Sequence, residues 1–101
     1  MAAVGRRGEA LAAAERVVAM REELAASNRA AYLPDLARSF WTAAYVRKVL
    51  GTDFAAALTY CERAISLYRE LVEVESDAFG EDLAAVEAVH DKLSRGGDGP
   101  G

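Results

Sequence analysis

The sequence predicts an all-α fold in which four antiparallel helices form a short helical-repeat (α-solenoid) segment. In four stretches, apolar residues recur every three, four or seven positions, which is the period of one helix face, and no stretch has the two-residue period of a strand. The chain also resembles itself at an offset of 47 residues, where ten of the 28 pairs between 10–37 and 57–84 are identical. A repeat of this length with two helices per unit is typical of solenoids, in which each unit buries its face against the next.

One domain is expected over residues 7–94, because a chain of 101 residues provides a single modest core. Its helices are predicted at about 7–26, 33–50, 53–74 and 80–93. Residues 1–6 are expected to be a frayed lead-in, and the glycine-rich stretch 95–101 is expected to be disordered.

The helix at 33–50 has a helical neighbour on each side in sequence, so the rest of the chain is expected to pack on it. Pro34 suits the first turn of a helix, and Gly51 suits the left-handed residue that ends one. Asn28 is the predicted turn residue before this helix, and Thr52 or Asp53 is the predicted cap of the next. The predicted buried face consists of Leu33, Leu36, Phe40, Ala43 and Leu50.

The other three helices each have an apolar face of their own. The face of the first helix consists of Ala10, Leu11, Ala14, Val17, Val18 and Leu24. That of the third consists of Phe54, Ala57, Leu58, Cys61, Ala64, Ile65, Tyr68 and Leu71. That of the fourth consists of Leu83, Val86, Val89 and Leu93, and Gly80 weakens the start of this helix.

Composition excludes several classes of function. The net charge of −4 argues against a nucleic-acid partner, which would require a clustered basic excess. The single cysteine, Cys61, allows no internal disulfide and fits a reducing compartment, so a cytoplasmic location is expected. The N-terminal stretch has charges from Arg6 onward and lacks an uninterrupted apolar core, so neither a signal peptide nor a membrane span is expected.

Four segments carry a resemblance to a known family: GRRGEAL at 5–11, YLPDLARSF at 32–40, LG at 50–51 and ALTYCERAI at 57–65. They resemble the tetratricopeptide repeat (TPR), in the long form found in kinesin light chains and many bacterial regulatory proteins. The resemblance covers roughly residues 5–84. It implies close packing of paired helices at positions held by small residues, here Ala10, Ala44, Gly51, Ala57 and Ala64.

The chain departs from the family pattern at two positions in particular. Arg47 stands where the family usually has a large apolar or aromatic residue, and Glu87 stands where an aromatic residue is expected from Phe40. Arg47 has two alternatives, pairing with a carboxylate of the third helix or extending its charged end to solvent, and the second is favoured. In family terms the chain opens on a second helix and ends on a first helix, so association of copies through exposed repeat ends is a possible outcome.

A second stripe on the 33–50 helix is the predicted partner-binding site. Family members usually bind through first helices that face the concave groove, and the resemblance transfers this role to Arg38, Trp41, Thr42, Tyr45 and Lys48. Aromatic faces supply contact area and the basic groups supply charge-assisted bonds to an acidic or C-terminal peptide. The alternative is that Trp41 and Tyr45 only pack on a neighbouring helix. The carboxylate-clamp subtype is not supported, because these two residues stand where its asparagine-type contacts would lie.

No catalytic, metal or cofactor site is predicted. Cys61 falls at a small-residue packing position and is expected to be an inert core thiol. His90 is expected to be a surface histidine, and the glutamates are expected on solvated helix faces, where pairing with arginine explains them. The tail glycines precede no helix, so they form no phosphate-binding loop.

The expected function is therefore that of a non-enzymatic scaffold that binds a peptide or partner helix through a TPR-like groove. The alternative is a structural or self-assembling repeat segment of a larger signalling or regulatory protein with no independent ligand.

Overall fold

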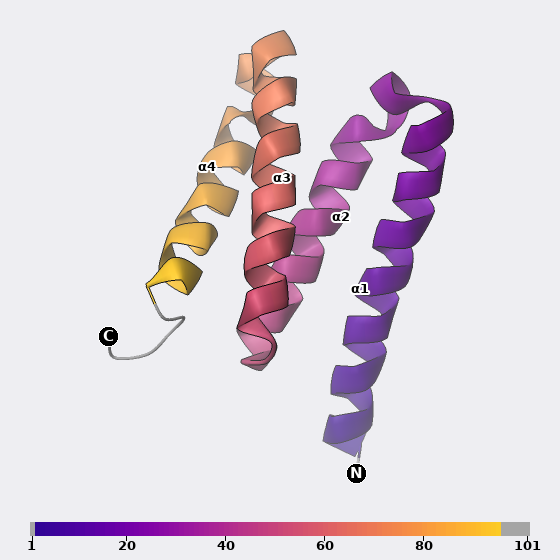
Figure 1. Ribbon diagram of the computed structural model, residues 1–101, viewed down its shortest axis with the longest axis vertical. Coiled ribbons are helices and arrows are strands. Elements are labelled where there is room, and N and C mark those ends of the chain that lie inside the picture. The colour runs from indigo at the N-terminus through magenta and orange to yellow at the C-terminus, as the bar shows by residue number, and fades with distance from the viewer. Residues whose placement is uncertain (1, 96–101) are drawn as a thin grey trace.

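The computed structural model describes residues 2–95, which form four helices and contain no strand. The helices are α1 (Ala2–Ser27), α2 (Arg29–Leu50), α3 (Phe54–Val74) and α4 (Ser76–Ser94). Each packs antiparallel on its neighbour in sequence (Figure 1), and α2 also makes a small contact with α4. The predicted all-α architecture of successive antiparallel helices is confirmed.

Three helices, α1, α2 and α4, begin earlier in the sequence than expected. Residues 2–6, expected to be a lead-in, belong to α1, which is consistent with the high helix propensity of alanine at positions 2 and 3. Helix α2 begins at Arg29 because the side chain of Asn28 accepts a hydrogen bond from the N–H of Ala31 at 3.3 Å and so caps the helix. Pro34 therefore lies inside α2 rather than in its first turn.

The junction before α4 is also shorter than expected. Glu75 ends α3 and begins α4, and its extended backbone is the only break between the two helices. Gly80 consequently lies within α4 rather than at its start. The expected disordered tail lies, from residue 96 onward, outside the described residues.

The turn between α2 and α3 is the one that the sequence predicts most closely. Gly51 adopts a left-handed conformation with φ of 67°, and its N–H bonds to the carbonyl of Lys48. Asp53 is also left-handed, with φ of 51°, and its carboxylate accepts a bond from the N–H of Ala56 at 3.3 Å. Aspartate tolerates this conformation better than most residues because its short polar side chain bonds locally.

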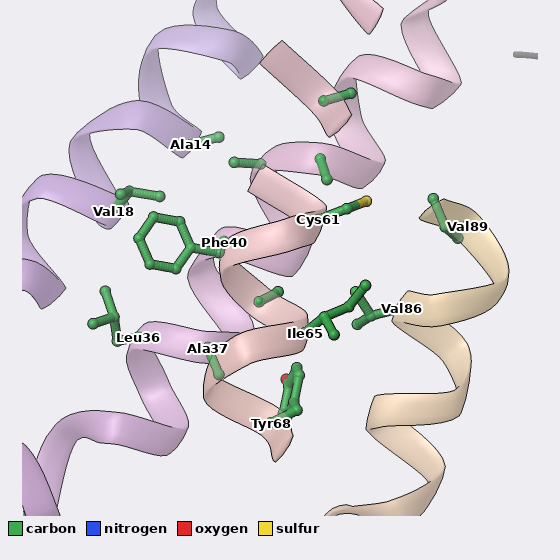
Figure 2. Packing of buried hydrophobic residues seen from close by; sticks show 14 of the residues in the cluster. Ala14, Val18, Leu36, Ala37, Phe40, Cys61, Ile65, Tyr68, Val86 and Val89 are labelled. Carbon is green, nitrogen blue, oxygen red and sulfur yellow. The ribbon is translucent and has the colours of Figure 1, made fainter. Parts of the chain in front are cut away.

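The core consists of a large cluster of apolar side chains from all four helices (Figure 2). Five alanines in the two middle helices have no exposed surface, which lets the helix backbones approach closely: Ala37, Ala43, Ala44, Ala57 and Ala64. Tyr68, Val86 and Cys61 are the largest fully buried side chains. The buried faces predicted for α2, α3 and α4 are found there, with Leu50, Phe54, Leu58 and Leu83 half-buried.

The predicted face of α1 is only partly buried. Ala14 and Val18 are in the core, whereas Ala10 and Val17 are exposed. Helix α1 packs closely on α2 alone, whereas α2 and α3 each have helices on two sides. A single neighbour covers a narrower stripe of the helix, so part of the apolar face stays open.

Arg47 is buried, so the expectation that its charged end reaches solvent is wrong. Its guanidinium donates to the carboxylate of Glu15 on α1 and, at 3.1 Å, to the carbonyl of Ala43 on its own helix. The guanidinium also lies over the ring of Tyr60 on α3, 4.9 Å from the centroid, and Nε is 3.9 Å from the carboxylate of Asp53. The close carboxylate thus comes from α1 rather than from the third helix.

The pairing of Arg47 with Glu15 predicts an unequal response to two substitutions. Glu15→Gln is expected to lower the free energy of unfolding by about 2 kcal/mol, because a buried guanidinium loses its charged acceptor. Arg47→Met, which keeps much of the volume and removes the buried charge, is expected to cost less than about 1 kcal/mol. Urea unfolding followed by circular dichroism measures both, with Glu23→Gln on the exposed side of α1 as the control. Equal stability of Glu15→Gln and Glu23→Gln would contradict the role given to the pair.

Candidate functional site

Two of the five predicted site residues form an aromatic pair on the flank of α2. The rings of Trp41 and Tyr45 meet edge to face, with centroids 5.3 Å apart and planes at 75°. Trp41 is half-buried against the core, while Tyr45 is 48% exposed. The alternative that these rings only pack on a neighbouring helix therefore applies to part of the Trp41 side chain. The pair still presents an aromatic surface to solvent. We call Trp41 and Tyr45 the aromatic face.

Two other predicted residues, Arg38 and Thr42, line a groove between α1 and α2. This α1/α2 groove has a volume of about 390 Å³. Its lining residues are Ala10, Ala13, Ala14, Val17, Arg21, Asp35, Arg38, Ser39, Thr42 and Val46. The structure therefore divides the predicted site between two adjacent surfaces of α2. Lys48, half-buried one turn beyond Tyr45, does not line the groove.

The groove has a buried floor and a partly charged rim. Ala14 and Ser39 are the buried residues among those that line the groove. The hydroxyl of Ser39 donates a hydrogen bond to the carbonyl of Leu36 at 2.8 Å. At one end Arg21 pairs with Asp35 at 2.9 Å. The side of the groove that belongs to α1 consists of alanine and valine apart from Arg21, so its interior is mainly apolar.

The α1 side of this groove is absent from the site that the sequence predicts. Ala10 and Val17 were expected to be buried, and Ala13 is not on the predicted face. The internal repeat contains a signal that points to the groove, because Ala13 aligns with Tyr60 and Ser39 aligns with Val86. Smaller residues in the first unit leave space where the second unit has bulk.

Arg38 also influences Tyr68, which is buried at the junction of α3 with α2 and α4. Burial raises the pKa of Tyr68 above its usual value, and the carboxylate of Asp82 on α4 raises it further. The charge of Arg38 and a hydrogen bond from it lower this pKa and partly offset the rise. Arg38 thus connects the groove rim with the buried phenol of Tyr68.

The arrangement around His90 has the order of a serine–histidine–acid relay but lacks its geometry. Nδ1 of His90 is 3.5 Å from the hydroxyl of Ser94, and Nε2 is 3.4 Å from the carboxylate of Glu62. These distances are long for the hydrogen bonds of a nucleophile and its base, and both Ser94 and Glu62 are exposed to water. His90 itself is half-buried rather than fully on the surface.

Cys61 lies in the core between helices. Burial, together with the nearby carboxylate of Glu62, raises the pKa of its thiol from 9.0 to about 11. A thiol with this pKa is almost entirely protonated at neutral pH and is a weak nucleophile.

The described part of the chain has neither a metal-binding cluster nor a membrane-spanning helix. Residues 2–95 hold no group of three or more His, Cys, Asp or Glu side chains placed to bind a metal ion. None of the four helices is long and apolar enough to cross a membrane over its described residues.

Comparison of the chain with protein-family models, curated proteins and solved structures finds no match.

The raised pKa of Cys61 predicts slow modification of the folded protein. At pH 8, the reaction of Cys61 with Ellman's reagent is expected to be at least about 100-fold slower than that of a free cysteine, because the raised pKa and burial both oppose it. Urea should restore the rate, and Cys61→Ala gives the background.

The raised pKa of Cys61 also makes the free energy of unfolding depend on pH in the alkaline range. Since the folded-state pKa is raised, the contribution of Cys61 to the free energy of unfolding is fully present below pH 9 and falls as the pH rises towards about 11.

For the reaction with Ellman's reagent, a rate in the native state as fast as that of free cysteine would contradict the buried, protonated thiol.

Proposed function

We propose that this chain is a TPR-like protein-interaction module that binds a peptide or partner helix through one side of α2. The observation that carries the proposal is the exposed aromatic face, Trp41 and Tyr45, next to an open groove that Arg38 and Thr42 line. Lys48 adds a basic group one turn further along the same flank. The internal repeat and the successive antiparallel packing of the helices support a repeat-type module.

The aromatic face has the chemistry of an interface anchor. Aromatic side chains provide a large contact area at a low cost in conformational entropy, and they dominate the binding energy of many interfaces. Arg38 adjoins them and provides a charge-assisted bond to an acidic group of a partner. A partner that carries an apolar surface with acidic residues beside it fits this combination.

We further propose that the module is not an enzyme and acts in the cytoplasm. The protonated Cys61 thiol and the water-exposed neighbours of His90 argue against a nucleophile in the described region. A single buried cysteine is compatible with a reducing compartment.

A second candidate function is that of a structural or self-assembling repeat segment within a larger regulatory protein. The observation in its favour is the open α1/α2 groove at the α1 end of the helix stack, since solenoid units usually bury such surfaces against a neighbouring unit. Light scattering on the purified chain separates the two candidates. A monomer supports the binding module, and a concentration-dependent oligomer supports self-assembly.

Removal of the two rings of the aromatic face tests the proposed function. The double variant Trp41→Ala/Tyr45→Ala is expected to lose capture of a protein partner, with at least about a tenfold loss of affinity for that partner once it is purified. The double variant Met20→Ala/Val74→Ala removes exposed apolar side chains elsewhere and should behave like the wild type.

Immobilised protein, mass spectrometry of the captured proteins and titration with the purified partner give this measurement. Circular dichroism should show the same helicity for all variants. Unchanged capture by Trp41→Ala/Tyr45→Ala would overturn the assignment of this surface.

A further inference from the structure

The α1/α2 groove has a counterpart within the same chain. At the offset of 47 residues, its lining residues on α1 align with Ala57, Tyr60, Cys61, Ala64 and Tyr68 of α3. Those on α2 align with Asp82, Ala85, Val86, Val89 and Leu93 of α4. Most of these counterparts are buried, and α2 is the helix that packs on α3 and also reaches α4. Within the chain, a groove of this kind is therefore occupied by a helix.

The α1/α2 groove lacks such a helix among the described residues. The structure shows the difference in exposure directly, since Ala57 and Ala64 have no exposed surface while their counterparts Ala10 and Val17 are exposed. Ala13 provides additional space, because its counterpart is Tyr60. The groove thus has room for a helix placed as α2 is placed on α3 and α4.

The charges on the groove differ from those that α2 meets. Arg47 of α2 lies 3.9 Å from Asp53, and the counterpart of Asp53 is Arg6, which is exposed. Arg38 of α2 lies near enough to Tyr68 to lower its pKa, and the counterpart of Tyr68 is Arg21. A helix placed in this way in the α1/α2 groove would meet arginine at both points, of which Arg21 also pairs with Asp35 and Arg6 is exposed. Carboxylates fit there better than arginines do.

A second copy of the chain fits this surface poorly. Two copies with grooves face to face would bring like charges together, since each contributes Arg6, Arg21 and Arg38, against one Asp35. Helix α4 of another copy is the repeat counterpart of α2, but it presents Glu87 where α2 has Phe40 and Asp91 where α2 has Ala44. Both are exposed, so this face of α4 is polar and does not offer the apolar side chains that would pack in the groove.

We propose that the α1/α2 groove binds an acidic amphipathic helix of a partner protein, in the position that α2 takes on α3 and α4. The apolar face of that helix packs on Ala13, Val17 and Val46, and its carboxylates face Arg6 and Arg21. This inference rests on the proposed function, since both require a protein partner. Failure of the proposed function and failure of this inference can be told apart. The double variant Trp41→Ala/Tyr45→Ala leaves the groove lining intact, and a substitution in the groove leaves the aromatic face intact.

Two synthetic peptides test the inference against the full 101-residue chain. One copies residues 29–51, and the other copies them with Arg38→Glu and Arg47→Glu. Fluorescence anisotropy of labelled peptide measures affinity for the wild-type chain and for Ala13→Trp, which fills the groove. Ala12→Trp, next to it on α1 but outside the groove lining, is the matched control, because both alanines are exposed.

The acidic peptide is expected to bind the wild type at least about threefold more tightly than the unmodified peptide, as two partly exposed ion pairs replace two repulsions. Ala13→Trp should weaken its binding by more than about tenfold, and Ala12→Trp should change it by less than about twofold. Arg6→Glu in the chain should reduce or reverse the preference for the acidic peptide.

Absence of binding, equal affinity for the two peptides, or equal effects of Ala13→Trp and Ala12→Trp would overturn the inference. Light scattering adds one further outcome. A dimer that Ala13→Trp abolishes would show that a second copy occupies the groove and would also overturn it. Helicity by circular dichroism shows that each variant is folded.

Discussion

One buried guanidinium connects α1 with the two middle helices. Arg47 makes contact with Glu15 on α1, with its own helix through Ala43, and with Tyr60 and Asp53 at the start of α3. A buried charge is costly unless it is paired, so a placement of α1 that removes Glu15 from Arg47 is strongly disfavoured. Since α1 packs closely on α2 alone, this pair contributes to its register together with the ion pairs Arg21–Asp35 and Glu22–Arg63. The width of the α1/α2 groove follows from that register.

The two ends of the helix stack differ because the two repeat units diverge in residue size and charge. At the α4 end, Glu87 and Asp91 replace the large and small apolar residues of the equivalent face of α2. At the α1 end, alanine and serine replace tyrosine and valine. The first change makes the surface polar, and the second leaves an apolar hollow. The open apolar surface described by the repeat comparison therefore lies at the α1 end, and the alignment of the two units shows this asymmetry.

Sequence periodicity predicts the buried faces well where a helix has neighbours on two sides. It identifies the large apolar residues buried in α2 and α3 and the turn at Gly51, because these depend on spacing and on local backbone preferences, but it leaves out the buried Ala37 and Ser39. It fails at Ala10 and Val17, because periodicity shows which residues share a face but does not show how wide a stripe a single neighbour covers. It also fails at Arg47, since the acceptor lies 32 residues away on α1 and depends on tertiary placement.

The predicted binding site is found on one helix but on two surfaces, and Arg38 lies at the point where they meet. Its side chain lines the α1/α2 groove, stands one turn from the aromatic face, and lowers the pKa of the buried Tyr68. In the proposed complex, a partner carboxylate on Arg38 partly neutralises the charge that lowers the pKa of Tyr68. The proposed binding surface and the buried Tyr68 are therefore linked through the charge of a single side chain.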